Sequence, residues 1–144
     1  DVGDEDVQKA IEIAQAKGFI EEKENGILSE ISQGGTNVSG GQRQRLSIAR
    51  ALAKRPKVYI FDDSFSALDF KTDAALRKAL SEETKDKTVL IVAQRISTIM
   101  NAEKIIVLDE GKIVGMGTHK ELLKNCSVYK QIALSQLSEE ELAI

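Results

Sequence analysis

The feature that most constrains this chain is a turn of small polar residues, followed by an apolar run that ends in two carboxylates. The apolar run covers residues 58–61, and Asp62 and Asp63 come directly after it. A helix beginning at the turn would offer a phosphate its free backbone N–H groups and the positive end of its dipole. A carboxylate at the end of a buried strand is a natural partner for hydrated Mg²⁺ bound to phosphates. The turn consists of Ser39, Gly40, Gly41 and Gln42.

This order of elements suggests a nucleotide triphosphatase, but the usual third part of such a site is missing. The glycine-rich phosphate loop, G-x-x-x-x-G-K-[ST], occurs nowhere in the 144 residues. Half of the nucleotide-binding machinery therefore has to come from elsewhere. We expect the chain to be a proteolytic or engineered fragment that is completed by another polypeptide or by a second copy of itself.

Composition argues against several classes of function. The net charge of −3, from 20 basic and 23 acidic residues, argues against binding to nucleic acid or anionic lipid. The longest aliphatic run, residues 89–93, is far shorter than the roughly 20 apolar residues that span a bilayer. The single cysteine, Cys126, has no disulfide partner within the chain and is expected to be buried. The single histidine, His119, cannot by itself build a histidine-based metal site and is expected at the surface.

Two helices are expected in the first part of the chain. The first has Asp4 as its expected N-cap and carries apolar residues at helical spacing until Gly18 ends it in a left-handed turn. The second begins with a capping box, in which Ser39 and Gln42 satisfy each other's backbone N–H groups, and it stops at Pro56. The polar residues 21–37 between the two helices are expected to form a long loop, which is often functional in a compact domain.

Strands alternate with helices in the remainder of the chain, which predicts an α/β fold with a mainly parallel sheet. The runs at residues 58–61 and 88–93 are almost entirely apolar, as is typical of strands that are buried on both faces. Residues 105–108 and 113–114 flank the turn sequence Asp-Glu-Gly and are expected to form a hairpin with Gly111 in the left-handed position.

These motifs, in this order and spacing, resemble those of the ATP-binding-cassette (ABC) ATPases over almost the whole chain. Residues 37–45, Asn-Val-Ser-Gly-Gly-Gln-Arg-Gln-Arg, resemble the signature motif, and residues 58–63 resemble the Walker B strand. Residues 66–69, Ser-Ala-Leu-Asp, resemble the D-loop. Residues 89–95 resemble the switch strand, and residues 105–117 resemble the hairpin that follows it. Together these motifs are far more specific than any one of them.

The resemblance implies a partial P-loop NTPase fold of the ABC ATPase type, without its Walker A region. Residues 1–56 would belong to the helical subdomain that carries the signature helix, and residues 57–144 to the C-terminal part of the RecA-like core. Residues 29–35 resemble the loop through which exporters contact their transmembrane domains, although Ser32 and Gln33 replace the usual Gly and Glu. The implied location is the cytoplasmic face of the cell membrane, as part of a membrane transporter that couples ATP binding and hydrolysis to efflux of multidrug or lipid-like substrates.

In this family two nucleotide-binding domains dimerise head to tail around two ATP molecules. The resemblance implies that Asp62 holds Mg²⁺ through water and that Asp69 lies at the dimer interface. It also implies that Asp63 and Gln94 belong to the ATP site of this chain itself. The residues expected to clamp the ATP of the partner are Ser39, Gly40, Gly41 and Gln42.

The chain departs from the family at two positions of one site. The family has glutamate where this chain has Asp63, and histidine where it has Gln94. Aspartate is one methylene shorter, and a misplacement of about 1 Å can cost on the order of 100-fold in rate. Glutamine never carries a charge, and a neutral hydrogen bond is about half as strong as a charge-assisted one. The pattern resembles the degenerate half of heterodimeric bacterial multidrug exporters, whose partner is a different chain; alternatively, Asp63 works as a slightly displaced base.

Two other functions remain open from the sequence. One is the C-terminal half of a split ATPase of the chromosome-maintenance type, which would bind DNA and show heptads before its signature motif; residues 1–30 show none. The other is a non-catalytic interaction module that only regulates a partner. By itself the chain is expected to be inactive and to bind ATP poorly, because no phosphate loop holds the β- and γ-phosphates.

Overall fold

The computed structural model describes residues 2–142. They form two compact units, with the boundary between Val92 and Ala93. Within the described residues, no helix combines the length and the apolar character that crossing a membrane requires.

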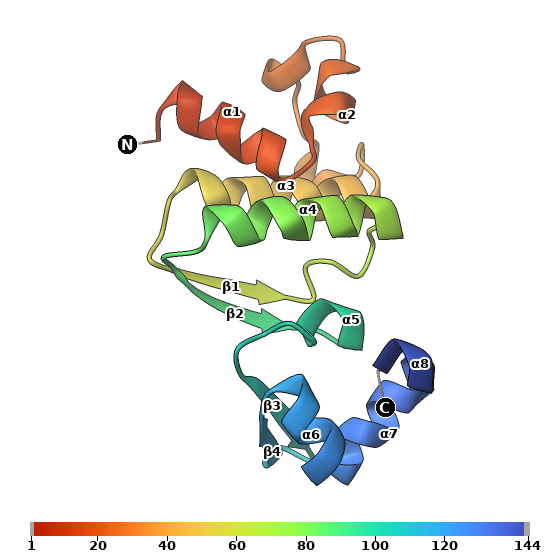
Figure 1. Cartoon of the computed structure of the whole chain (residues 1–144). Coiled ribbons are helices and arrows are strands. Elements are labelled where there is room, and N and C mark those ends of the chain that lie inside the picture. The colour runs from red at the N-terminus through yellow and green to blue at the C-terminus, as the bar shows by residue number, and fades with distance from the viewer. Residues whose placement is uncertain (1, 143–144) are drawn as a thin grey trace. The chain divides into compact units, whose positions relative to one another are not determined.

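The N-terminal unit is an α/β arrangement built on one parallel pair of strands. Strands β1 (Val58–Asp62) and β2 (Thr88–Val92) pair in parallel, with Val58 opposite Thr88 and Asp62 opposite Val92. Helices α3 (Gly40–Ala53) and α4 (Phe70–Glu83) lie side by side over one face of this pair, and α1 (Asp4–Ile13) lies on α3 (Figure 1). Three short elements complete the unit: α2 (Lys17–Glu21), η1 (Gly26–Leu28) and η2 (Gln33–Gly35).

Strand β1 has one buried face, which corrects the expectation of burial on both. Tyr59 and Phe61 point into the core, where their rings stack with centroids 5.9 Å apart. Ile60, between them, is 67% exposed, and Leu90 and Val92 of β2 are about half exposed. Successive side chains of a strand point to opposite faces, and the face opposite to α3 and α4 stays open in this unit.

The first helix ends earlier than the sequence predicts. Helix α1 stops at Ile13, its N-cap is Gly3 rather than Asp4, and Gly18 lies within α2. The chain reverses at Gln15, whose φ of 57° is in the left-handed region that Gly18 was expected to supply. This turn buries Ala14 and Ala16 completely, so side-chain packing, and not glycine, determines where the helix ends.

The C-terminal unit consists of a hairpin and helices. Strands β3 (Ile105–Asp109) and β4 (Lys112–Gly117) pair antiparallel, with a bulge between Val107 and Leu108. Glu110 and Gly111 both have positive φ, at 46° and 75°, as a two-residue type I′ turn requires. The predicted hairpin is therefore confirmed, and it is a two-stranded sheet of its own. The helices are α5 (Ile96–Ile99), α6 (His119–Asn125), α7 (Ser127–Gln136) and α8 (Glu139–Leu142).

His119 is not a surface residue, contrary to the prediction. Its side chain is 9% exposed, and its Nδ1 lies 2.7 Å from the hydroxyl oxygen of Tyr129, which is itself buried. Cys126 is buried, as expected. His119 begins α6 directly after a capping box of Thr118 and Glu121, and the packing of α6 on α7 turns its ring inward.

The boundary between the two units differs from the subdomain boundary expected after residue 56. One apolar core runs through that point, because Ile48 and Leu52 of α3 belong to the same cluster as Tyr59 and Phe61 of β1. The division into a helical subdomain and a RecA-like core stays a prediction from the resemblance.

Candidate functional site

The turn at the start of α3 has the geometry that its sequence predicts. The backbone N–H of Gln42 donates to Oγ of Ser39 at 3.2 Å, and the N–H of Ser39 donates to Oε1 of Gln42 at 3.0 Å. A helix leaves its first N–H groups without intrahelical acceptors, and this box satisfies neither the Gly40 nor the Gly41 N–H. Ser39 and Gly40 are exposed. The start of α3 can therefore receive an anion from solvent.

The first turn of α3 packs closely against the segment that follows β1. A Cβ atom built on Gly41 would lie 2.9 Å from the carbonyl oxygen of Ala67, a distance that real Cβ atoms do not tolerate. At Gly40 the nearest atom would be Cβ of Ala67, at an ordinary 3.6 Å. Only a glycine at position 41 allows the helix to come this close to the D-loop-like residues 66–69.

The loop before α3 is fixed to the same motif by side-chain hydrogen bonds. The side chain of Asn37 accepts from the N–H of Ser32 at 3.0 Å and donates to the carbonyl of Glu30 at 2.9 Å. Arg43 donates to the carbonyl of Gly34 at 3.2 Å. The exporter-like residues 29–35 are thus held by the two ends of the signature-like segment, although they contain little regular structure.

The two carboxylates stand at the C-terminal end of β1, where the structure leaves both exposed. Asp62 is the last residue of the strand. Asp63 has a φ of 47°, a conformation that non-glycine residues adopt at a cost, and its N–H donates to the carbonyl of Val92 at 3.0 Å. The described residues contain no group of three or more His, Cys, Asp or Glu side chains that could hold a metal ion. One or two exposed carboxylates fit Mg²⁺ that keeps its waters and takes its other ligands from phosphates.

Gln44 contributes contacts that sequence reasoning missed. Its Nε2 donates to the carbonyl of Asp63 and to Oγ of Ser66, both at 3.0 Å, and its Oε1 accepts from the N–H of Ala67 at 2.9 Å. Oγ of Ser66 also lies 3.1 Å from Oδ2 of Asp63. A polar residue in the second turn of an amphipathic helix gives no signal in sequence that it reaches a strand end.

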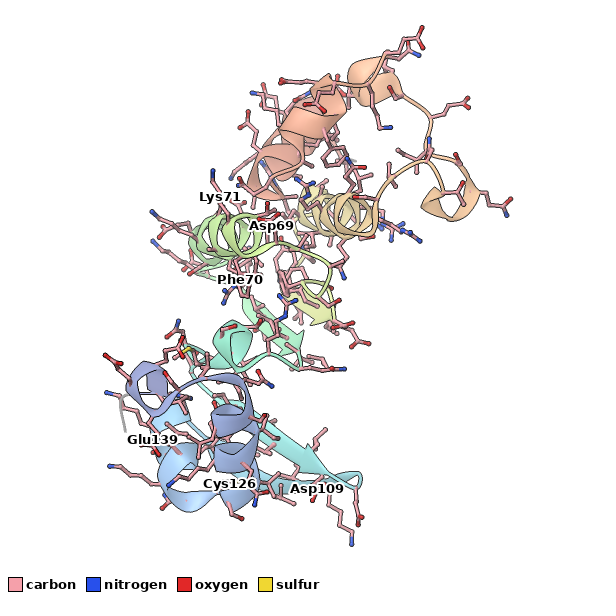
Figure 2. All side chains as sticks on the ribbon, turned by 90° about the vertical axis from the view of Figure 1, so that its right-hand side faces the viewer. Asp69, Phe70, Lys71, Asp109, Cys126 and Glu139 are labelled. Atoms are coloured by element: carbon pink, nitrogen blue, oxygen red, sulfur yellow. The ribbon has the colours of Figure 1, made fainter. Side chains whose placement is uncertain are left out.

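Asp69 is the N-cap of α4. Its Oδ1 accepts from the N–H of Thr72 at 2.9 Å, and the hydrogen bonds from Thr72 lower the pKa of the Asp69 carboxyl. The carboxylate is therefore charged near neutral pH and lies on the surface of the N-terminal unit. Figure 2 shows the neighbouring Phe70 at the start of α4, where its side chain is 85% exposed.

Gln94 lies two residues after the end of β2 and belongs to the C-terminal unit. Its side chain is exposed, and its backbone carbonyl accepts from Nε2 of Gln136 at 2.8 Å. Oε1 of Gln136 accepts in turn from the N–H of Ile96 at 2.8 Å. Gln136 thereby fixes the backbone on both sides of residue 95, a role that the sequence did not reveal.

The predicted site residues thus divide between the two units. The signature-like turn, both carboxylates and Asp69 lie in the N-terminal unit, where α3 and the segment after β1 are in direct contact. Gln94 lies in the C-terminal unit.

Comparison with known proteins identifies the family that this chain resembles. Residues 4–66 match the family described as ABC transporter. An uncharacterized ABC transporter ATP-binding protein of Mycobacterium bovis is 47% identical over 135 residues, which cover 94% of this chain and 23% of that protein. An ATP-dependent lipid A-core flippase of Vibrio vulnificus is 44% identical, again over 94% of this chain and 23% of its own length. This chain therefore spans about a quarter of the length of the curated relatives it matches.

A solved structure supports the same assignment. A bacterial Atm1-family ABC exporter with ATP bound superposes with a TM-score of 0.89 and 31% sequence identity, over 96% of this chain and 24% of that one. The fold is the partial α/β fold of an ABC ATPase. The chain belongs to the ABC transporter family, as part of its ATP-binding domain.

Proposed function

We propose that this chain is the C-terminal part of the nucleotide-binding domain of an ABC exporter, which couples ATP binding and hydrolysis to efflux across a membrane. The observation that carries the proposal is the direct packing of the signature-like turn on the segment after β1, with Ser39 and Asp63 both exposed. An anion-binding helix start and an acid-tipped strand are thereby held on one rigid unit.

The residues of this chain would serve two different ATP molecules. Ser39, Gly40, Gly41 and Gln42 would donate hydrogen bonds to the ATP of a second nucleotide-binding domain. Asp62 would hold Mg²⁺ through water at the chain's own site, and Mg²⁺ would neutralise charge on the phosphates there. Asp69 would lie at the interface between the two domains.

The chain's own site would be the weaker of the two. Asp63 would orient the attacking water. Its side chain is one methylene shorter than that of glutamate, so its carboxylate lies closer to the backbone. The backbone of Asp63 is held by hydrogen bonds at its N–H and its carbonyl, so it resists the shift that would restore the reach. Gln94 would contact the γ-phosphate without a charge. Slow turnover at this site and an intact signature together favour a heterodimer with a different chain.

The loop at residues 29–35 supports a contact with transmembrane domains. Ser29 and Ile31 line an open, mainly apolar cavity of about 340 Å³ in the N-terminal unit, together with Leu46 of α3. Ile31 and the neighbouring Leu28 expose 45% and 84% of their surface. An apolar segment of the transporter would fit this region. The location would then be the cytoplasmic face of the membrane, and the substrates would be several drugs or a lipid-like compound. The flippase relative is named for lipid A-core.

The test of the weak site is to restore the family residues in the complete transporter with its partner. Asp63→Glu combined with Gln94→His should raise ATP turnover at this site, about tenfold or more if the carboxylate is misplaced by about 1 Å. Asp109→Glu, which makes the same change on an exposed carboxylate of the hairpin, is the matched control and should change nothing. Unchanged turnover in the double variant would contradict the degenerate site, and a wild-type transporter without ATPase activity would contradict the proposed function itself.

The isolated chain should be inactive and should bind ATP weakly, because it holds no phosphate loop. Isothermal calorimetry tests this directly, and micromolar binding would contradict it. Reconstitution with the N-terminal half of the domain should restore ATPase activity, whereas an inert interaction module would stay inactive.

A further inference from the structure

We propose that Gln44 is a positioning residue for Asp63. Through Gln44, the orientation of the Asp63 carboxylate at this chain's own ATP site depends on the position of α3, the helix whose signature-like turn serves the other ATP site. The inference rests on the proposed function and assigns a role to a residue of the signature-like segment that is not among the expected site residues. It begins from the hydrogen bonds that join α3 to the turn after β1.

The orientation of the Gln44 amide is fixed by its partners. Both Nε2 hydrogens have an acceptor, the carbonyl of Asp63 and Oγ of Ser66, and Oε1 has a donor in the N–H of Ala67. The flipped amide would put Nε2 against an N–H and Oε1 against a carbonyl, so the geometry admits only one orientation. One side chain of α3 therefore holds three residues of the turn, Asp63, Ser66 and Ala67.

Gln44 also reaches the carboxylate of Asp63 through Ser66. Oγ of Ser66 lies within hydrogen-bond distance of two oxygens of Asp63, the carbonyl at 3.2 Å and Oδ2 at 3.1 Å. A hydroxyl has one proton to donate, and a charged carboxylate is a stronger acceptor than a neutral carbonyl. The path from α3 to the Asp63 carboxylate is thus Gln44 Nε2, Ser66 Oγ and Asp63 Oδ2.

The backbone of Asp63 needs this support. A non-glycine residue with a φ of 47° is in a sparsely populated conformation, which persists only where the surroundings determine it. The N–H of Asp63 is held by Val92 of β2, and its carbonyl by Gln44 of α3. Helix α3 and strand β2 therefore hold the backbone of Asp63 from two sides, and this backbone sets the direction of the carboxylate.

The same helix carries the signature residues. Gln44 lies one turn beyond Gly41, where the first turn of α3 packs so closely on Ala67 that a Cβ on Gly41 would lie 2.9 Å from its carbonyl oxygen. A displacement of α3 caused by nucleotide at its N-terminus would move the turn with it. Through Gln44 the change would reach the Asp63 carboxylate.

The test uses the complete transporter with its partner and a variant that removes the hydrogen bonds at similar volume, Gln44→Met. Hydrogen exchange of peptides that cover residues 63–69 should become about tenfold faster, since each lost hydrogen bond is worth about that factor. Gln8→Met, the same change at an exposed position of α1, is the control and should leave this segment unchanged. Unchanged exchange in Gln44→Met would overturn the proposal.

A double-mutant cycle distinguishes a residue that positions the Asp63 carboxylate from one that only stabilises the fold. The gain in turnover from Asp63→Glu should fall to less than about twofold in the Gln44→Met background, because the two residues act together. Gln44→Glu keeps the acceptor for Ala67 but sets an oxygen against the carbonyl of Asp63, so it should lose the gain as Gln44→Met does. An equal gain from Asp63→Glu with and without Gln44 would overturn the coupling. If Asp63→Glu gives no gain in either background, the exchange measurement alone decides the role of Gln44, and the double variant with Gln94→His decides the degenerate site.

Discussion

Nδ1 of His119 lies 2.7 Å from the hydroxyl oxygen of Tyr129, and this pair joins the start of α6 to α7 inside the C-terminal unit. The rings meet edge to face, with centroids 5.7 Å apart. Nε2 of His119 is buried and has no hydrogen-bond partner among residues 2–142. Protonation of the ring would therefore place a charge where only one of its two N–H groups is satisfied.

The first prediction follows from this pair. Burial, assisted by the cation of Lys120, lowers the pKa of His119 from its ordinary 6.5. Between that value and the folded-state pKa the unfolded chain binds more protons, so stability is full above pH 6.5 and is lost as the pH falls through the folded-state pKa. Urea denaturation from about pH 7 to about pH 5.5, where His is the side chain that normally titrates, should show a falling midpoint.

The matching variant is His119→Gln, which keeps a polar side chain beside Tyr129 and does not titrate. Its denaturation midpoint should depend less on pH over the same interval, because His119 is the only histidine of the chain. Identical pH dependence in the two proteins would show that the pair does not control stability.

The second prediction concerns Arg45, which joins α3 to the reversal after α1. Its Nη1 donates to the carbonyl of Gln15 at 2.6 Å, and its guanidinium carbon lies 4.7 Å from the ring centroid of Phe19. Lysine cannot reproduce the planar fork and the stacking together. We expect Arg45→Lys to lower the free energy of unfolding by about 1–2 kcal/mol, as measured by urea denaturation.

The control for this prediction is the same substitution at an exposed position of the same helix. Arg50→Lys should change the free energy of unfolding by less than about 0.5 kcal/mol. Equal effects at both positions would mean that the contact with Gln15 and Phe19 contributes nothing specific.

Local features of the fold could be predicted from the sequence because their partners are close in the chain. The capping box of Ser39 with Gln42 forms as expected, and Thr118 and Glu121 form a second box of the same kind. Each depends on residues three positions apart, whose geometry a helix start fixes by itself. The family motifs were found for the same reason, since each is a short continuous run.

Contacts between distant segments could not be predicted in this way. Gln44 reaches a residue 19 positions away, and Gln136 reaches one 42 positions away. Neither glutamine differs in local pattern from a solvated helix residue. His119 was misplaced for a related reason, because its position in the first turn of α6 does not reveal which neighbour covers it. The exposure of one face of β1 could not be predicted either, since an apolar run does not indicate which segments pack on it.

The third prediction tests the two faces of β1. Phe61 is 2% exposed and packs on the rings of Tyr59 and Phe65, whereas Ile60 is 67% exposed. Phe61→Ala should lower the free energy of unfolding by about 3–5 kcal/mol, because it leaves a cavity in the core. Ile60→Ala should cost less than about 1 kcal/mol in the isolated chain. Urea denaturation of the two variants decides the assignment, and similar costs would show that both faces are packed.

The fourth prediction compares two neighbouring glycines at the start of α3. Replacing a helical glycine by alanine normally stabilises by up to about 1 kcal/mol, because alanine loses less backbone entropy. Gly40→Ala should follow this rule or be neutral, since the new Cβ would be 3.6 Å from Cβ of Ala67. Gly41→Ala should instead destabilise by about 1–3 kcal/mol, since its Cβ would be 2.9 Å from the rigid carbonyl oxygen of Ala67. Thermal or urea denaturation of both variants measures the difference, and a stabilised Gly41→Ala protein would mean that α3 can move away from the turn and does not hold Asp63 in place.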